Sequence, residues 1–387
     1  MRICFIVIGN SRRSNYLNGD TIRYGKGGGS GTDGSSILVA EYLSAIGHEV
    51  VIVTEELEPQ LVELYDPFEY GKVIRGVQYT NKDFVGIDNL EFDVLVNSLW
   101  FNDYNSLPIR VTKSLIYWCH MQWIYGIDEM LDYVRENNLD LNFVNISQWE
   151  RSMTEETIFS ASRRYGRVNS VMIPNPIMDE MITEVLLDPP TRKKHKFSFH
   201  AVWARGGNVA VEAVRELNLH SPEFHAFDYL MATHDHGDSF FVKHDGVDKK
   251  TLFTHLAESD YFIYPLYTPY EDVHKDTFAC VVAEAIALGV IVITYPLGAL
   301  KEFYDGYCRW VDFPEGFDVQ QAQSEPLTKD YEGKFKNTNN IVKAINEIES
   351  DPEFKESIRN LGKKYIMENF SIAVVGKKWE SLLNSLG

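Results

Sequence analysis

Short apolar runs alternate with amphipathic stretches along the first half of the chain. Five of these runs are candidate β-strands, at residues 2–8, 49–54, 93–96, 115–119 and 143–147. Between the first two, apolar residues at 35–46 recur at helical spacing, and Gly47 is a natural helix stop. Because near-continuous apolar strands alternate with helices, this half predicts a parallel sheet covered on both faces.

The same alternation restarts after residue 185. A polar link with two prolines, at 188–194, precedes further strands at 197–202, 226–231, 240–244, 261–264 and 290–294, with helices at 208–217 and 277–288. We therefore predict an α/β protein of two Rossmann-like, doubly wound lobes, residues 1–186 and 187–369. Two such lobes form a cleft at the carboxyl ends of their strands.

Composition narrows the function classes. The chain has 387 residues, 44% of them hydrophobic, which suits two ordinary domains. Its net charge of −19 argues against a groove for nucleic acid, because such a groove must neutralise many phosphates. A nucleotide-sized ligand needs only a few local donors, which an acidic chain can supply.

The cysteines and the apolar stretches indicate a cytoplasmic protein. Four cysteines are far apart and form no C-x-x-C pair, so we expect reduced core residues: Cys4, Cys119, Cys280 and Cys308. The longest apolar stretch, 278–300, is interrupted by Glu284 and Gly289, so it predicts a helix and a strand, not a membrane span. A peripheral membrane contact stays open.

A glycine-rich segment at 29–34 matches G-x-G-x-x-G, and Glu55 and Glu56 follow the second strand. An NAD-binding dehydrogenase is therefore an alternative. That mechanism needs the first glycine directly at the strand end, whereas here roughly twenty residues intervene. The segment also fits a loop before a helix whose amino end holds an anion, or a surface loop without a ligand.

Two acids eight residues apart are the most informative feature of the chain. Asp276 is placed as the N-cap of the helix at 277–288, where backbone N–H groups could donate to a phosphate or hydroxyl. Glu284 lies two turns along an otherwise apolar helix, and burying it without partners is costly. A ribose diol would satisfy Glu284. The alternative is an N-cap aspartate and a glutamate paired with a nearby Lys or Arg.

This segment resembles the E-x7-E signature of retaining GT-B glycosyltransferases, particularly glycosyltransferase family 4, with Asp276 in place of the first Glu. Further family motifs follow in the same order, at 28–31 (glycine loop), 47–50 (G-H-E-V), 173–177 (I-P-N-P-I), 298–302 (G-x-x-x-E) and 369–372 (N-F-S-I). The chain is also similar to glycosyltransferases of large algal DNA viruses, the chloroviruses. If it is virus-encoded, the host cytoplasm is its expected location.

The resemblance implies roles for residues of the second lobe. Glu284 would bind the nucleotide ribose and Asp276 the hydroxyls of the donor sugar. The backbone at Phe278, Ala279 and Cys280 would contact the sugar and the diphosphate. The loop carrying Asp245 and Val247 would lie near the base.

The family holds the diphosphate with an Arg and a Lys five residues apart. Here His200 falls on the Arg position and Arg205 on the Lys position. Arg205 can bind phosphate bidentately, whereas a neutral His200 would do less. A solvated loop charge is the other interpretation of Arg205.

Two features of the first lobe are donor-side candidates. His120 ends the strand at 115–119, where the family often has a histidine beside the donor sugar, although a structural histidine is the alternative. In the glycine loop, Gly29 and Gly31 would let the donor approach the backbone. The last helix, 370–387, would cross back to this lobe.

We expect no metal and no cofactor. His234, Asp235, His236 and Asp238 are suitable ligand types, but neighbours in one loop rarely converge on one ion. The resemblance implies retaining transfer of a hexose from a nucleotide sugar, GDP-mannose first and UDP-glucose next, to a glycan or other hydroxyl acceptor. A non-catalytic nucleotide- or sugar-binding module stays open beside the dehydrogenase.

Overall fold

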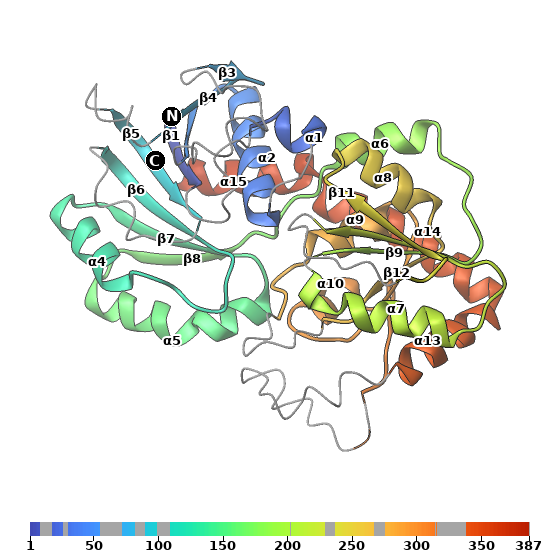
Figure 1. Ribbon diagram of the computed structural model, residues 1–387. Coiled ribbons are helices and arrows are strands. Elements are labelled where there is room, and N and C mark those ends of the chain that lie inside the picture. Colours follow the sequence, from blue (N-terminus) through green and yellow to red (C-terminus); the bar gives the residue numbers. More distant parts are fainter. Residues whose placement is uncertain are drawn as a thin grey trace. The chain divides into compact units, whose positions relative to one another are not determined.

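The chain divides into two compact units, and each has its own sheet (Figure 1). The computed structural model describes residues 1–7, 18–25, 30–54, 72–81, 90–98, 109–201, 203–228, 237–266, 275–313, 315 and 338–386. The first unit comprises Met1–Ile22, Gly29–Pro176 and Phe370–Gly387, and the second comprises Arg23–Gly28 and Ile177–Asn369. The boundary lies before residue 177, not after 186, because helix α6 (Asp179–Leu187) packs on helix α8 (Lys249–Glu258) of the second unit.

The sheet of the first unit has eight strands in the order β3-β4-β2-β1-β5-β6-β7-β8. They are β1 (Arg2–Val7), β2 (Glu49–Thr54), β3 (Val73–Ile74), β4 (Val77–Asn81), β5 (Glu91–Asn97), β6 (Arg110–Cys119), β7 (Asp140–Asn145) and β8 (Val168–Met172). All neighbours are parallel except β3 and β4. The strand order reverses between β1 and β5, which is the topological switch point of this sheet.

Helices cover this sheet on both faces. They are α2 (Gly31–Ala45) and α15 (Ile372–Ser385) at one end, and α4 (Ile127–Glu136) and α5 (Gln148–Arg164) beside β7 and β8 (Figure 1). The carboxyl-terminal α15 packs tightly on α2, since a Cβ added at Gly376 would lie 2.5 Å from the ring of Tyr42. The short α1 (Thr21–Tyr24) spans the division between the units.

The second unit has a six-stranded, fully parallel sheet in the order β11-β10-β9-β12-β13-β14. The strands are β9 (Lys196–His200), β10 (Glu223–Asp228), β11 (Phe241–Asp245), β12 (Tyr261–Tyr264), β13 (Ile291–Thr294) and β14 (Arg309–Trp310). Its other helices are η3 (Trp203–Arg205), α7 (Gly207–Glu216), α9 (Cys280–Ala287), α10 (Leu300–Tyr304), α13 (Asn339–Glu349) and α14 (Pro352–Phe370). The order reverses between β9 and β12.

The predicted α/β class with two Rossmann-like units is confirmed. The central strands β12 and β13 are buried at every position, as their continuous apolar sequences indicate. Among the helices that the structure describes, none combines the length and the apolarity that a membrane crossing demands.

Candidate functional site

Arg205 stands in a tight turn at the carboxyl end of β9. The turn η3 ends at Arg205, and Gly206 then adopts φ 108° before α7 begins. A Cβ at Gly206 would lie 2.9 Å from Pro265, and one at Gly207 would lie 2.2 Å from the Trp203 ring. Both positions therefore require glycine, and the contact with Pro265 brings the turn against the end of β12.

Three polar side chains meet at the switch point of the second sheet. Arg205 Nη1 donates to Asp276 Oδ1 at 2.9 Å and to the Tyr264 hydroxyl at 2.7 Å. Tyr264 in turn donates to Asp276 Oδ2 at 2.6 Å. Because the carboxyl ends of β9 and β12 meet where the strand order reverses, this is the place where open α/β sheets bind ligands.

The predicted N-cap position of Asp276 is wrong. Helix α9 begins at Cys280, and its N-cap is Ala279 in the left-handed region at φ 57°. The segment before α9 is bound to the turn at 298–299, since the Ala299 N–H donates to the Asp276 carbonyl. Gly298 makes this possible, because a Cβ there would lie 2.4 Å from that carbonyl oxygen. Asp276 thus turns to Arg205 and Tyr264 instead of capping the helix.

The beginning of α9 is the accessible part of this segment. Thr277, Ala279, Cys280 and Val281 are partly exposed, whereas all residues at 282–294 are buried. The Phe278 ring is buried against Phe303, and its carbonyl accepts from the Tyr304 hydroxyl at 2.7 Å. In the first turn, the N–H groups of Val282 and Ala283 donate to the Ala279 carbonyl. The positive end of the helix dipole lies at this accessible end of α9, so it can attract an anion.

Glu284 is paired with a lysine, which is one of the two alternatives that the sequence left open. Lys249 Nζ donates to Glu284 Oε1 at 3.1 Å and to Oε2 at 3.0 Å. The side chains are 15% and 6% exposed, so the pair is largely withdrawn from water. Glu284 lies in the second turn of α9, close to its beginning, because that helix begins four residues later than Asp276.

Sequence reasoning missed Lys249 and Tyr264. Lys249 and Lys250 occupy the first turn of α8, after the N-cap Asp248, where cations oppose the helix dipole. Both are paired with acids, Glu284 and Glu184. Two lysines in the first turn of a helix are unfavourable, and this could have indicated acidic partners from the sequence. The hydroxyl of Tyr264 at the end of a strand could likewise have indicated a site residue.

His200 and the β11 loop complete the predicted donor residues of this unit. His200 ends β9, and burial, reinforced by the charge of Lys249, lowers its pKa to about 3, so the ring is neutral. Asp245 is the last residue of β11, but its side chain lies outside the described part of the structure. Val247 is partly exposed in the turn before α8.

In the first unit, His120 follows β6 and is 7% exposed, with its ring 4.7 Å from that of Trp118. Burial lowers the pKa of His120 to about 3, which keeps the imidazole neutral. A neutral ring can exchange hydrogen bonds with hydroxyl groups but cannot neutralise phosphate.

The glycine segment forms the beginning of α2. Gly31 is its first residue, and Ser30 and Asp33 form a capping box, in which each side chain accepts from the backbone N–H of the other. Gly29 lies outside the described residues. Helix α1 comes between β1 and α2, so the helix does not follow the first strand directly, as dinucleotide binding requires.

Most of the acidic and histidine-rich loop lies outside the described residues. His234, Asp235 and His236 lie outside the described residues. Asp238 accepts from Arg215 Nη2 at 2.6 Å, so the described member of the group has a cation as its partner.

Solved structures share this architecture over the whole chain. Sucrose-phosphate synthase from Thermosynechococcus elongatus superposes with a TM-score of 0.64 at 11% identity, covering 100% of this chain and 98% of that one. A glycosyltransferase from Rickettsia africae gives 0.58 at 13% identity, with 100% and 98% covered. The catalytic domain of starch synthase IV from Arabidopsis thaliana, bound to ADP and acarbose, gives 0.54 at 12%, with 100% and 99% covered.

These likenesses show the fold, and the predicted GT-B class is confirmed. No protein-family model matches the chain, and no curated protein matches its sequence. The narrower resemblance to family 4 and to viral glycosyltransferases therefore stays a prediction.

Proposed function

We propose that the chain is a glycosyltransferase that transfers a sugar from a nucleotide sugar bound in the second unit. The observation that carries this proposal is the meeting of Arg205, Tyr264 and Asp276 at the switch point of a GT-B sheet. A cation, a hydroxyl and a carboxylate there match the diphosphate and hydroxyl groups of such a donor.

The diphosphate would lie against Arg205 and the beginning of α9. A guanidinium has five N–H donors, so Arg205 can keep Asp276 and still reach phosphate oxygens. The helix dipole and the first-turn N–H groups at Cys280 and Val281 add fixed positive potential. The negative charge that develops on the leaving diphosphate would be stabilised by these groups, without a step that calls for a metal ion.

Asp276 would orient the donor sugar. Arg205 and Tyr264 each hold one of its oxygens, which fixes the plane of the carboxylate. A carboxylate has about four acceptor sites, so sugar hydroxyls can still donate to it. The missing methylene relative to glutamate is offset by this fixed orientation.

Glu284 would accept from the ribose hydroxyls while Lys249 retains its hydrogen bonds. The pair is already desolvated, so part of the cost of burying the carboxylate is met before the donor binds. Neutral His200 lies near Lys249, and its buried Nδ1 has no hydrogen-bond partner among the described residues.

We infer retention of configuration, through front-face attack on an oxocarbenium-like state, with a hexose as the transferred group. The preference for GDP-mannose, then UDP-glucose, rests on the family resemblance alone. The acceptor, a glycan or other hydroxyl compound, would bind in the first unit near His120, and a cytoplasmic location belongs to the same proposal.

The test is donor binding and turnover in a panel of nucleotide sugars, with and without a chelator. Release of nucleoside diphosphate on addition of acceptor separates an enzyme from a binding module, and NAD titration tests the dehydrogenase. We expect Glu284→Gln to weaken nucleoside diphosphate binding by about 1.5–3 kcal/mol, the scale of hydrogen bonds to a charged group. The control is Glu212→Gln, an exposed acid of α7. Equal affinity in both folded variants would remove Glu284 from the site.

A further inference from the structure

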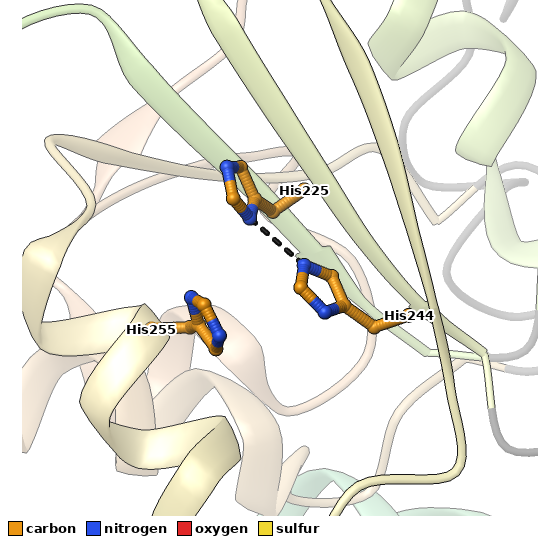
Figure 2. A group of neighbouring side chains, drawn as sticks. All are labelled: His225, His244 and His255. Carbon is orange, nitrogen blue, oxygen red and sulfur yellow. Dashed lines mark hydrogen bonds between the residues drawn. The ribbon is translucent and has the colours of Figure 1, made fainter.

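Three histidines of the second unit gather on one face of its sheet. His225 comes from β10, His244 from β11 and His255 from the last turn of α8. Figure 2 shows the three rings pointing toward one another, and one nitrogen of each lies within 4.8 Å of the others. We propose that these histidines bind a divalent transition-metal ion, with Zn²⁺ as the first candidate.

The sheet register explains why the first two meet. Phe227 pairs with His244 in the parallel ladder and His225 pairs with Val242, so His225 and His244 are diagonal neighbours on the same face. Their Nδ1 and Nε2 atoms are 2.9 Å apart. The helix that follows β11 lies over this face, and the His255 ring is 4.6 Å from the His244 ring and 5.4 Å from the His225 ring.

The donor set selects the class of ion. Zinc binds imidazole nitrogen at about 2.0–2.1 Å, which places tetrahedral ligand atoms roughly 3.3–3.5 Å apart. The ring nitrogens of His225 and His244 are 2.9 Å apart, and all three ligand nitrogens lie within 4.8 Å of one another. Small rotations of the rings would therefore bring the nitrogens to the spacing that zinc requires. Imidazole suits Zn²⁺, Cu²⁺ and Ni²⁺, whereas Mg²⁺ and Ca²⁺ prefer oxygen. Three protein ligands leave a fourth position for water.

Carboxylates stand behind two of the three rings. Glu223 Oε2 is 3.1 Å from His225 Nε2, and Glu258 Oε2 is 3.7 Å from His255 Nδ1. A carboxylate that accepts from the outer N–H of an imidazole leaves the inner nitrogen for the ion and raises its basicity.

Lys196 competes with the proposed ion for a hydrogen-bonding arrangement of His255. Its ammonium lies 3.3 Å from His255 Nδ1 and 2.5 Å from Glu258 Oε2. Without an ion, Lys196 can donate to His255, which then carries its proton on Nε2. Binding of the ion would require His255 to move that proton to Nδ1 and to donate to Glu258. The ion would therefore replace two hydrogen bonds, the one between His225 and His244 and the one from Lys196 to His255. Glu258 already balances the charge of Lys196, so the ion meets no unpaired ammonium.

The ion would fasten α8 to β10 and β11, and it would take no part in sugar transfer. His255 is six residues beyond Lys249 on α8, about 9 Å along the helix axis. The proposal is therefore independent of the proposed function, and it can be tested without a donor.

The experiment uses the whole chain after treatment with a chelator. Co²⁺ and then Zn²⁺ are titrated, with visible absorption for Co²⁺ and calorimetry for Zn²⁺. We expect one equivalent at micromolar affinity or tighter, and a higher thermal midpoint with the ion. His255→Gln should weaken binding at least 100-fold, while His220→Gln, an exposed histidine of the same unit, should leave it unchanged.

Glu223→Gln is a second variant that keeps all three histidines, so it tests the site even if His255→Gln misfolds. We expect it to weaken binding roughly 10-fold, the lower end of such effects. Lack of binding by the native chain would overturn the proposal. So would a bound ion whose affinity is the same in the native chain, His255→Gln and Glu223→Gln, because that ion would sit elsewhere.

Discussion

The switch points of the two sheets are built from different chemistry. In the first unit, the hydroxyls of Ser36, on α2, and Ser98, after β5, lie 3.0 Å apart and are buried. In the second unit, Arg205 and Asp276 occupy the corresponding edge. Neutral hydroxyls suit a neutral, hydroxylated ligand, whereas a guanidinium suits phosphate. The contrast fits the proposed anionic donor in the second unit, whereas the buried serine pair fastens α2 to the end of β5.

The buried acids of the two units differ in the same way. Glu150 accepts from the Asn145 amide, the Ile146 N–H and the Thr154 hydroxyl, all neutral donors within nine residues along the chain. Asp276 takes its cation from 71 residues away. Glu150 therefore stabilises the turn around it, whereas Asp276 joins the segment before α9 to the turn after β9.

Loss of Arg205 should have the largest effect. Arg205→Gln removes the proposed phosphate cation and the partner of Asp276, so we expect kcat/KM and donor affinity to fall about 100-fold, roughly 2.7 kcal/mol. The control is Arg215→Gln, whose pair with Asp238 is more exposed. Steady-state kinetics and calorimetry on both variants test this, and similar losses in the two would contradict a special role for Arg205.

Gly298→Ala should come next. Alanine would have to adopt φ 62° there, and its Cβ would lie 2.4 Å from the Asp276 carbonyl oxygen, so we expect the unfolding free energy to fall by about 2.5 kcal/mol. Gly306→Ala shares the positive φ, at 82°, but meets no atom within 4 Å, and should cost about 1 kcal/mol. Urea unfolding measures both. Equal costs would mean that the close approach to Asp276 is unimportant.

Acid should destabilise the first unit through His120. Its folded pKa of about 3 lies below the ordinary 6.5, so the unfolded chain binds the proton first and stability falls as pH drops below 6.5. From pH 6.5 to 5.0 this group should contribute a loss of about 2 kcal/mol. His120→Gln should flatten that part of the urea-derived pH profile, whereas His220→Gln should not. Parallel profiles for native protein and His120→Gln would count against a buried neutral ring.

The serine pair should give the smallest effect. Ser36→Ala leaves Ser98 without one buried partner, and we expect a loss of about 1 kcal/mol of unfolding free energy with donor affinity unchanged. The exposed Ser381→Ala should cost less than about 0.5 kcal/mol. If Ser36→Ala weakens nucleotide binding instead, the division of roles between the two edges is wrong.

Local patterns carried the sequence analysis, and long-range contacts limited it. Continuous apolar runs located the central strands of both sheets, because burial on two faces leaves that signature. Four strands toward the sheet edges were not predicted: β3, β4, β8 and β14. The beginning of α9 was misplaced, since the position of Asp276 before it depends on Gly298 and Ala299, over twenty residues beyond Asp276. The capping box of Ser30 and Asp33 was readable as S-x-x-D, yet the glycines around it drew attention to phosphate binding.

The most direct test is a crystal structure of the chain with a nucleoside diphosphate. The account predicts phosphates within hydrogen-bonding distance of Arg205 and the first-turn amides of α9, with the ribose hydroxyls on Glu284. A nucleotide that binds away from α9 and makes no contact with Arg205 would contradict the account. So would a nucleotide that contacts the second unit only through an ion.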